Sequence, residues 1–286
     1  MWKISIIGAG ALGGAVADRV LQAGSGEVVL VDGDASDARG RALDAATAAA
    51  LRGDGGWVHA SDDWRDLAGS TAVVIAGGDA TAVRVSATQV AEHAPDAMVV
   101  VAAEPMEALT DLVAFTTLFP RQRVAGVGGV IDSARLRALV AAEVGASARD
   151  VWALVVGEHG DTMVPLLSSA SVAGAPVAEL IAAERLEEIA RRVRERPALD
   201  DLQARAAAAA QVVDGVTADR RRVVSCCVLC EGELGLERVC IDVPVRLGAG
   251  GVEEIVAVPM SDAERVALAH SADVVRERVA ALLGAG

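Results

Sequence analysis

The fold is decided by a stretch near the start of the chain, Lys3-Ile4-Ser5-Ile6-Ile7-Gly8-Ala9-Gly10-Ala11-Leu12-Gly13. Its first five residues favour a strand, and residues 15–23 have the apolar spacing of a helix. A second strand, at residues 27–31, ends at Asp32, which lies 19 residues after the last glycine of a G-x-G-x-x-G pattern. This order of elements predicts a βαβ unit that opens a doubly wound parallel sheet.

The three glycines of this turn each have a physical reason to be glycine. Gly8 permits a tight turn, Gly10 lets a pyrophosphate approach the backbone, and Gly13 lets the helix pack closely on the strand. The backbone of Ala11 and Leu12 completes the turn at the helix N-terminus, where the helix dipole favours phosphate. We therefore predict a dinucleotide-binding site.

The acid that closes the second strand bears on which dinucleotide is bound. Asp32 can accept hydrogen bonds from a ribose hydroxyl and repels a 2′-phosphate, which favours NAD over NADP. Arg39 and Arg41 follow downstream and keep a phosphate-bearing cofactor open as an alternative.

Strands and helices keep alternating up to about residue 127. We expect helices at residues 38–51, 82–93 and 106–118, and strands at residues 57–60, 72–76, 97–102 and 123–126. Repeated βα units imply a parallel sheet with helices on both faces and a ligand at the carboxyl ends of its strands. We place a Rossmann-type cofactor domain at residues 1–127.

The remaining residues, 128–286, predict a second, α+β domain that carries the substrate site. We expect helices at residues 132–144, 178–194, 199–216 and 262–283, and strands at residues 151–156, 223–230, 238–245 and 254–258. The active site is then expected in the crevice between the two domains.

A candidate acid–base group lies in a glycine-rich loop after the strand at residues 151–156. His159 is flanked by Gly157 and Gly160, which let the backbone pass close to a ligand. Asp132 and Arg135, three residues apart, share one face of a helix, and a histidine needs such a carboxylate to fix its tautomer. The alternatives are a solvated loop histidine, a helix N-cap at Asp132 and a surface ion pair at Arg135.

Composition excludes several classes of protein. The net charge of −14 argues against a nucleic-acid partner, and no run approaches the length of a membrane span. The first residues enter a strand and show no signal-peptide pattern. Cys227 and Cys230 are predicted on opposite faces of one strand, so we expect no metal site and a reducing cytoplasm.

The chain resembles the lactate/malate dehydrogenase family, and its malate dehydrogenase branch in particular. The resemblance covers nearly the whole chain and is carried by residues 6–13, by Gly128-Gly129-Val130-Ile131-Asp132-Ser133-Ala134-Arg135 and by His159-Gly160-Asp161-Thr162-Met163-Val164-Pro165. It implies a Rossmann domain followed by an α+β domain, NAD as cofactor, a small-molecule substrate and a homodimer or homotetramer.

The resemblance also implies a role for each site residue. His159 would exchange a proton with the substrate oxygen, Asp132 would hold and polarise His159, and Arg135 would bind the substrate carboxylate. Gly77 and Glu104 would border the cofactor, beside the residues of the glycine-rich turn.

Two departures from the family pattern concern the substrate. The family carries a mobile loop with two arginines after Gly77, whereas this chain runs directly toward the next helix with Arg84 as its only arginine there. Glu104 replaces an asparagine of the family, and the pocket segment around Leu202-Gln203-Ala204-Arg205 also differs. We expect a dehydrogenase of an atypical 2-hydroxy or 2-oxo acid rather than of malate. The alternative is a catalytically silent relative that binds a dinucleotide and acts as a partner or sensor.

Overall fold

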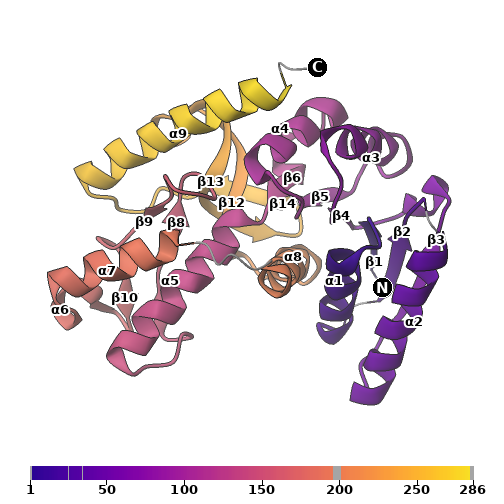
Figure 1. Ribbon diagram of the computed structural model, residues 1–286, viewed down its shortest axis with the longest axis horizontal. Coiled ribbons are helices and arrows are strands. Elements are labelled where there is room, and N and C mark those ends of the chain that lie inside the picture. Colours follow the sequence, from indigo (N-terminus) through magenta and orange to yellow (C-terminus); the bar gives the residue numbers. More distant parts are fainter. Residues whose placement is uncertain (1, 25, 34, 196–200, 284–286) are drawn as a thin grey trace.

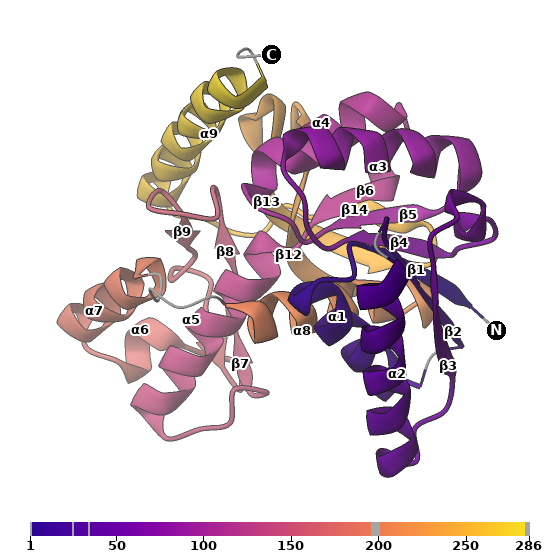
Figure 2. The same ribbon diagram turned by 45° about the vertical axis from the view of Figure 1, so that its right-hand side comes forward.

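The computed structural model describes residues 2–24, 26–33, 35–195 and 201–283. Within these residues a nine-stranded sheet runs through the molecule in the order β14-β13-β12-β6-β5-β4-β1-β2-β3 (Figures 1 and 2). Its parallel part consists of β1 (Lys3–Ile7), β2 (Glu27–Val31), β3 (Trp57–Ser61), β4 (Ala72–Ile75), β5 (Met98–Val101) and β6 (Val124–Gly126). The order 3-2-1-4-5-6 is that of a dinucleotide-binding sheet, so the predicted fold class is confirmed.

Alternate residues of the parallel strands pack on opposite faces of the sheet. Ile4, Ile6 and Leu30 join the core beneath α1 (Ala11–Gln22) and α2 (Ala35–Arg52). Ile7 and Val31 join the core beneath α3 (Ala80–His93) and α4 (Met106–Thr117). Burial on both faces explains why these strands read as unbroken apolar runs.

The C-terminal part continues the same sheet with three antiparallel strands. These are β12 (Arg222–Glu231), β13 (Glu237–Gly248) and β14 (Gly251–Ile255), and β12 pairs with β6 through Cys227 and Gly126. The strand predicted at residues 254–258 begins three residues earlier and ends at Ile255, because pairing with β13 resumes at once after a tight turn that brings Gly248 opposite Gly251.

The elements of residues 128–194 form a lobe beside the sheet, with its own core (Figure 1). This lobe contains α5 (Gly128–Val144), β7 (Val151–Trp152), β8 (Val155–Val156), β9 (Val164–Pro165), β10 (Ser171–Val172), β11 (Ala175–Pro176), α6 (Val177–Leu180) and α7 (Ala183–Arg194). The strand predicted at residues 151–156 is thus two short strands, and the helix predicted at residues 178–194 is two helices.

Two further helices complete the fold. The helix α8 (Leu202–Thr217) returns to the sheet and lies beside α1, where Arg19 donates a hydrogen bond to Gln203 (Figures 1 and 2). Its predicted start at Leu199 falls outside the described residues. The helix α9 (Asp262–Leu283) has its predicted bounds and crosses β13. Short 3-10 turns lie at Trp64–Leu67, Arg121–Arg123 and Glu233–Gly235.

One helix boundary matters for the site. The helix α5 starts at Gly128, four residues before its predicted start at Asp132, so the N-cap alternative for Asp132 is wrong. A Cβ on Gly128 would lie 2.8 Å from Oδ2 of Asp242 and 2.9 Å from Cβ of His159. The glycines that open α5 are therefore required by close packing and do not mark a bend in the chain.

Across the described part of the chain, we find no helix with the length and apolar character needed to span a bilayer.

The glycine-rich turn generates a prediction about stability. A Cβ on Gly13 would lie 1.9 Å from the carbonyl oxygen of Gly8, whereas a Cβ on Gly10 would meet no heavy atom within 4 Å. We expect Gly13→Ala to lower the free energy of unfolding by about 1–3 kcal/mol or more, because the backbone must shift. Gly10→Ala is the control and should change it by less than about 0.5 kcal/mol. Urea unfolding followed by circular dichroism makes the comparison, and equal losses in the two variants would contradict it.

Candidate functional site

The glycine-rich turn lies at the carboxyl end of β1, next to the end of β2. Gly8 has a φ of 93°, a conformation that favours glycine. The backbone N–H of Ala9 donates a hydrogen bond of 2.6 Å to Oδ2 of Asp32, so the acid at the end of β2 lies directly against the turn. The helix α1 begins at Ala11 with Gly10 as its N-cap.

This turn faces space that protein does not fill. A Cβ built on either Gly10 or Gly77 would meet no heavy atom within 4 Å. No side chain caps the N-terminus of α1, so its first backbone N–H groups point toward that space. A helix N-terminus beside an open glycine turn fits an anionic phosphate group.

The structure brings the three predicted catalytic residues together. Nδ1 of His159 lies 2.6 Å from Oδ2 of Asp132, and both side chains are almost fully buried. Nη1 of Arg135 lies 3.2 Å from the other oxygen of Asp132 and donates a second hydrogen bond to the carbonyl of Val193. Because the Asp132 carboxylate accepts a hydrogen bond from Nδ1 of His159, the other ring nitrogen, Nε2, is the one that faces the side where a substrate would bind.

Four separate elements fix the histidine loop. Gly157, which has a φ of 96°, exchanges two backbone hydrogen bonds with Asp242 of β13. The N–H of Glu158 donates to Oγ of Ser271 on α9, and the N–H of His159 donates to the buried carboxylate of Glu107 on α4. With Asp132 on α5, these contacts position His159 between the sheet, α4, α5 and α9.

A cavity of about 620 Å³ opens beside His159. It is bordered by the N-terminal turn of α4, by the histidine loop and by α9, and Glu104, Glu107, Glu158 and Arg278 are among its lining residues. Arg278 forms an ion pair with the buried Glu158. Oε1 of Glu104 lies 3.8 Å from Nε2 of His159.

A second carboxylate, that of Asp201, lies close to the same histidine. One donor atom from each of Glu104, His159 and Asp201 falls within 4.8 Å of the others. Asp201 directly precedes α8, and its Oδ1 lies 2.9 Å from Nε of Arg205. The ring of His159 therefore borders a region with two acidic side chains.

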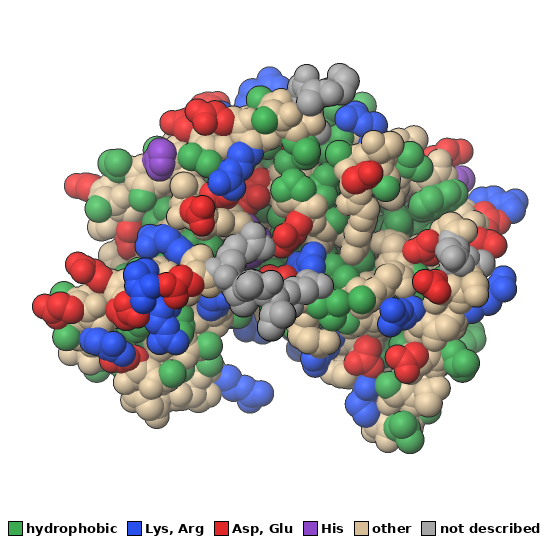
Figure 3. All heavy atoms as spheres, viewed as in Figure 1, with side chains coloured by type: hydrophobic (Ala, Val, Ile, Leu, Met, Phe, Trp, Pro, Cys, Tyr) green, Lys and Arg blue, Asp and Glu red, His purple; other side chains and the backbone are tan. Residues whose placement is uncertain are grey.

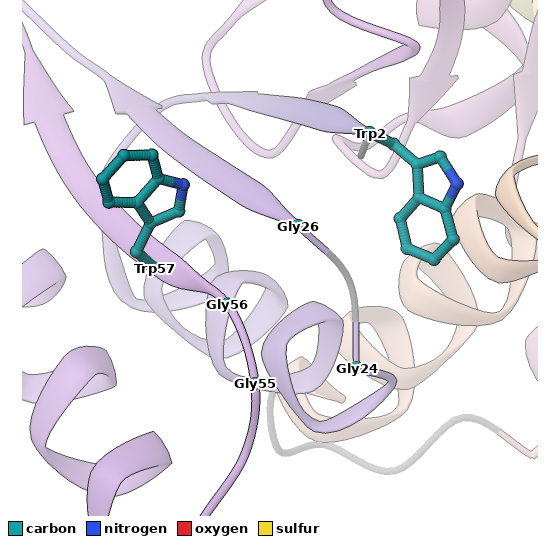
Figure 4. A pocket seen from close by; sticks show the side chains of 6 residues that line it. All are labelled: Trp2, Gly24, Gly26, Gly55, Gly56 and Trp57. Carbon is teal, nitrogen blue, oxygen red and sulfur yellow. The ribbon is translucent and has the colours of Figure 1, made fainter.

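A larger cavity, of about 780 Å³, lies at the other edge of the sheet (Figure 4). Its lining residues, Trp2, Gly24, Gly26, Gly55, Gly56 and Trp57, precede the strands β1, β2 and β3, whereas the glycine-rich turn follows β1. These side chains offer no acid, base or nucleophile, so we assign the chemistry to the cavity at His159.

Arg84 and Arg205, which lie in the two segments that depart from the family pattern, take different places. Arg84 is exposed on α3, and the connection between β4 and α3 consists only of residues 76–79. Arg205 lies on α8 next to Asp201. On the face shown in Figure 3, acidic and basic side chains are interspersed.

The cysteines lie as the strand pattern predicts. Cys230 shares a core with Cys226 and Val228, whereas Cys227 lies on the other face, against Gly126 and α4. All four cysteines are buried and free, and burial raises the pKa of the Cys230 thiol to about 12. These thiols are therefore inert core groups.

Sequence reasoning missed four residues around the histidine: Glu107, Asp201, Asp242 and Ser271. Glu107, Asp201 and Ser271 cannot be recognised from the sequence around them, because the residues that they contact are distant in the chain. Asp242 does carry a local signal, since an acid in the apolar run of residues 239–245 is unusual.

Asp242 is the most strongly perturbed of these groups. It is 2% exposed, and neither of its carboxylate oxygens meets the geometry of a hydrogen bond. Burial raises the pKa of this carboxyl well above its usual range, and the negative charge of Glu107 adds to the effect, while His159 and the N–H of Gly129 oppose it. The folded protein therefore favours the protonated form of Asp242.

This shift predicts how stability depends on pH. The raised pKa means that the folded state keeps a proton that the unfolded chain loses above a pKa near 3.8, so the wild type loses stability as the pH rises above that value. Asp242→Asn removes this dependence. We expect the variant to melt at a higher temperature than the wild type at pH 7, with the difference fading toward pH 4. The exposed Asp62→Asn serves as control, and a difference that grows toward low pH would refute the assignment.

The chain is similar to known proteins in both sequence and fold. A family model described as the lactate/malate dehydrogenase alpha/beta C-terminal domain matches residues 130–283. Malate dehydrogenase of Thermomicrobium roseum is 37% identical over 98% of this chain and 98% of its own. Malate dehydrogenase of Cryptosporidium parvum is 28% identical with a TM-score of 0.94, covering 99% of both chains.

A further solved structure shows a ligand-bound relative. The lactate dehydrogenase of Cryptosporidium parvum, in complex with lactic acid and nicotinamide adenine dinucleotide, is 30% identical with a TM-score of 0.93 and covers 98% of both chains. The matching family model, the sequence relatives and the solved structures agree, and the chain belongs to the lactate/malate dehydrogenase family of oxidoreductases.

Proposed function

We propose that this protein is an NAD-dependent dehydrogenase that transfers a hydride between the nicotinamide cofactor and a 2-hydroxy or 2-oxo acid. The observation that carries the proposal is the buried pair of His159 and Asp132, joined at 2.6 Å beside an open cavity. A relative of known structure binds both lactic acid and NAD, which supports a 2-hydroxy acid and a nicotinamide dinucleotide as the classes of ligand here.

The cofactor fits the residues at the carboxyl ends of β1, β2 and β4. Gly8, Gly10, Ala11, Leu12 and Gly13 would hold the pyrophosphate, since Gly10 faces open space and α1 begins at Ala11. Asp32 would accept the ribose hydroxyls, and Gly77 and Glu104 would border the rest of the cofactor. The bound dinucleotide would supply the hydride chemistry.

The side chains of the protein would transfer a proton and orient the substrate. His159 would give or take a proton at Nε2, on the hydroxyl or carbonyl oxygen of the substrate. Asp132 would stabilise the protonated ring and fix its tautomer through Nδ1. Arg135, held beside Asp132, would bind the substrate carboxylate, for which the planar guanidinium is suited.

We propose that the substrate is atypical for the family. Only residues 76–79 join β4 to α3, so no arginine-bearing loop covers the site from that side. The match to the Thermomicrobium roseum relative extends over 302 residues although this chain has 286, so that relative carries residues that this chain lacks. Glu104 stands where the family resemblance implies an asparagine, so the polar lining next to Nε2 of His159 differs from the family pattern.

We also propose a homodimer or homotetramer that works in the cytoplasm. The family resemblance supports the assembly, and four buried free thiols suit a reducing compartment.

The proposed role of His159 predicts a selective loss of turnover. We expect His159→Ala to lower kcat/KM for the best substrate of a 2-oxo acid panel by about 10²- to 10⁴-fold, because the general acid–base is lost. NADH binding, followed by fluorescence, should be retained. The exposed His59 on β3 provides the control variant His59→Ala. Wild-type protein that binds NADH but oxidises it with none of the acids would instead favour the catalytically silent relative.

The proposed role of Asp32 predicts the cofactor preference. A ligand that binds only the folded state raises the melting temperature, so NAD should stabilise the protein more than NADP at equal concentration. We expect Asp32→Ser to weaken NAD binding by about tenfold or more, since a hydrogen bond to a charged group is lost. Asp44→Ser, on the exposed face of α2, should leave binding unchanged. Because Asp32 also accepts a hydrogen bond from the backbone N–H of Ala9, the substitution could disturb the fold. A thermal unfolding curve of the cofactor-free Asp32→Ser variant must therefore show that it is folded.

A further inference from the structure

The cavity beside His159 is lined mainly by apolar side chains. Its volume of about 620 Å³ lies in the range of cavities that bind whole small molecules, and an acid as small as pyruvate would leave most of it unfilled. The helices α4 and α9 lie side by side and supply most of the lining (Figures 1 and 2). Its apolar members include Pro105, Met106, Ala108, Val275, Val279 and Leu282.

One face of α9 is turned toward this cavity. Val275, Val279 and Leu282 follow one another at intervals of four and three residues, which places them on the same side of the helix. Val275 is buried in the main core and Val279 packs partly against it, whereas Leu282 is 38% exposed. The apolar face of α9 therefore continues beyond the core into the open part of the cavity.

The polar side chains of the lining already have partners in the protein. The buried Glu158 pairs with Arg278, and Glu107 accepts a hydrogen bond from the backbone N–H of His159. Glu104 also has protein partners, His159 among them. A ligand that extends from His159 into the cavity therefore meets polar groups that are already satisfied, and burial of apolar surface is the main gain left to it.

We propose that the cavity between α4 and α9 holds the side chain of the substrate, and that the substrate is a 2-hydroxy or 2-oxo acid with a bulky apolar side chain. This inference rests on the proposed function, because it takes His159 as the group that meets the reacting oxygen. The side chain of the substrate then extends from His159 along α9 toward Leu282.

The apolar side chain takes no part in the bonds that change. The carbonyl carbon accepts a hydride and is reduced to an alcohol carbon, and the oxygen accepts the proton of His159, as in the proposed function. Contacts with α9 are therefore alike in the ground state and in the transition state, so they act on KM and leave kcat nearly unchanged. Each methylene group buried in the cavity should strengthen binding by about fourfold.

The first measurement is kcat/KM of the wild type with NADH and each of four acids: pyruvate, oxaloacetate, 4-methyl-2-oxopentanoate and phenylpyruvate. We expect both acids with bulky apolar side chains to exceed pyruvate by about tenfold or more, through a lower KM. Oxaloacetate should rank below them, because its second carboxylate would lose water against apolar side chains.

Two neighbouring alanines on α9 offer a matched pair of variants. Ala281 lines the cavity and is exposed, so Ala281→Trp fills the space without entering the core. We expect it to lower the ratio of kcat/KM for 4-methyl-2-oxopentanoate to that for pyruvate by about tenfold or more. Ala280 is also exposed but does not line the cavity, and Ala280→Trp should leave this ratio unchanged.

Truncation of the cavity wall gives a second, independent variant. Leu282→Ala should raise KM for 4-methyl-2-oxopentanoate by about three- to tenfold with kcat nearly unchanged, because the leucine is only partly covered. Val266, which is 71% exposed elsewhere on α9, provides the control variant Val266→Ala. Thermal unfolding curves establish that each variant is folded.

A wild type that prefers pyruvate or oxaloacetate to both apolar acids would overturn the inference and leave the proposed dehydrogenase standing. Equal changes in the ratio for Ala281→Trp and Ala280→Trp would overturn it as well. If NADH is consumed with none of the acids, the proposed function fails, and calorimetry with 4-methyl-2-oxopentanoate and NADH-loaded protein decides on the cavity. Binding that Ala281→Trp weakens would keep it as a site for apolar acids, and no binding to the wild type would remove it.

Discussion

The hydrogen bond between His159 and Asp132 is the contact on which the rest of the site depends. Both side chains are almost fully removed from solvent, so neither can be satisfied by water if the other moves. The helix α5 supplies the acid, the loop after β8 supplies the base, and the glycines that open α5 let the two approach. Arg135 then shares the acid with the histidine and is held at the same place.

Much of the fold could be predicted because its signals are local. The glycine pattern between β1 and α1, and the apolar runs of strands buried on both faces, identify the sheet from short windows of sequence. His159 and Asp132 could be paired because a lone carboxylate and a loop histidine each lie in a glycine-rich context. Boundaries were less predictable where tertiary packing decides them, as at Gly128, which belongs to a helix although it was expected before one.

The environment of the histidine could not be predicted, because it is assembled from distant segments. Glu107 reaches the backbone of His159 from 52 residues away, and Ser271 reaches Glu158 from 113 residues away. Nothing near either residue in the sequence indicates these partners. The result is a histidine surrounded by carboxylates on several sides, one of which, Asp242, has its pKa raised by burial. These carboxylates surround the buried pair of His159 and Asp132 and come from elements far apart in the chain.

The junction of β12 with β6 joins the half that contains the glycine-rich turn to the rest of the chain through backbone pairing. A cut in the chain after Val127 would leave an unpaired strand edge on each fragment, and such edges recruit other strands. The two halves are therefore poor candidates for separate expression or for exchange between relatives as interchangeable modules, and a graft would have to carry β12 and β13 along with the parallel strands.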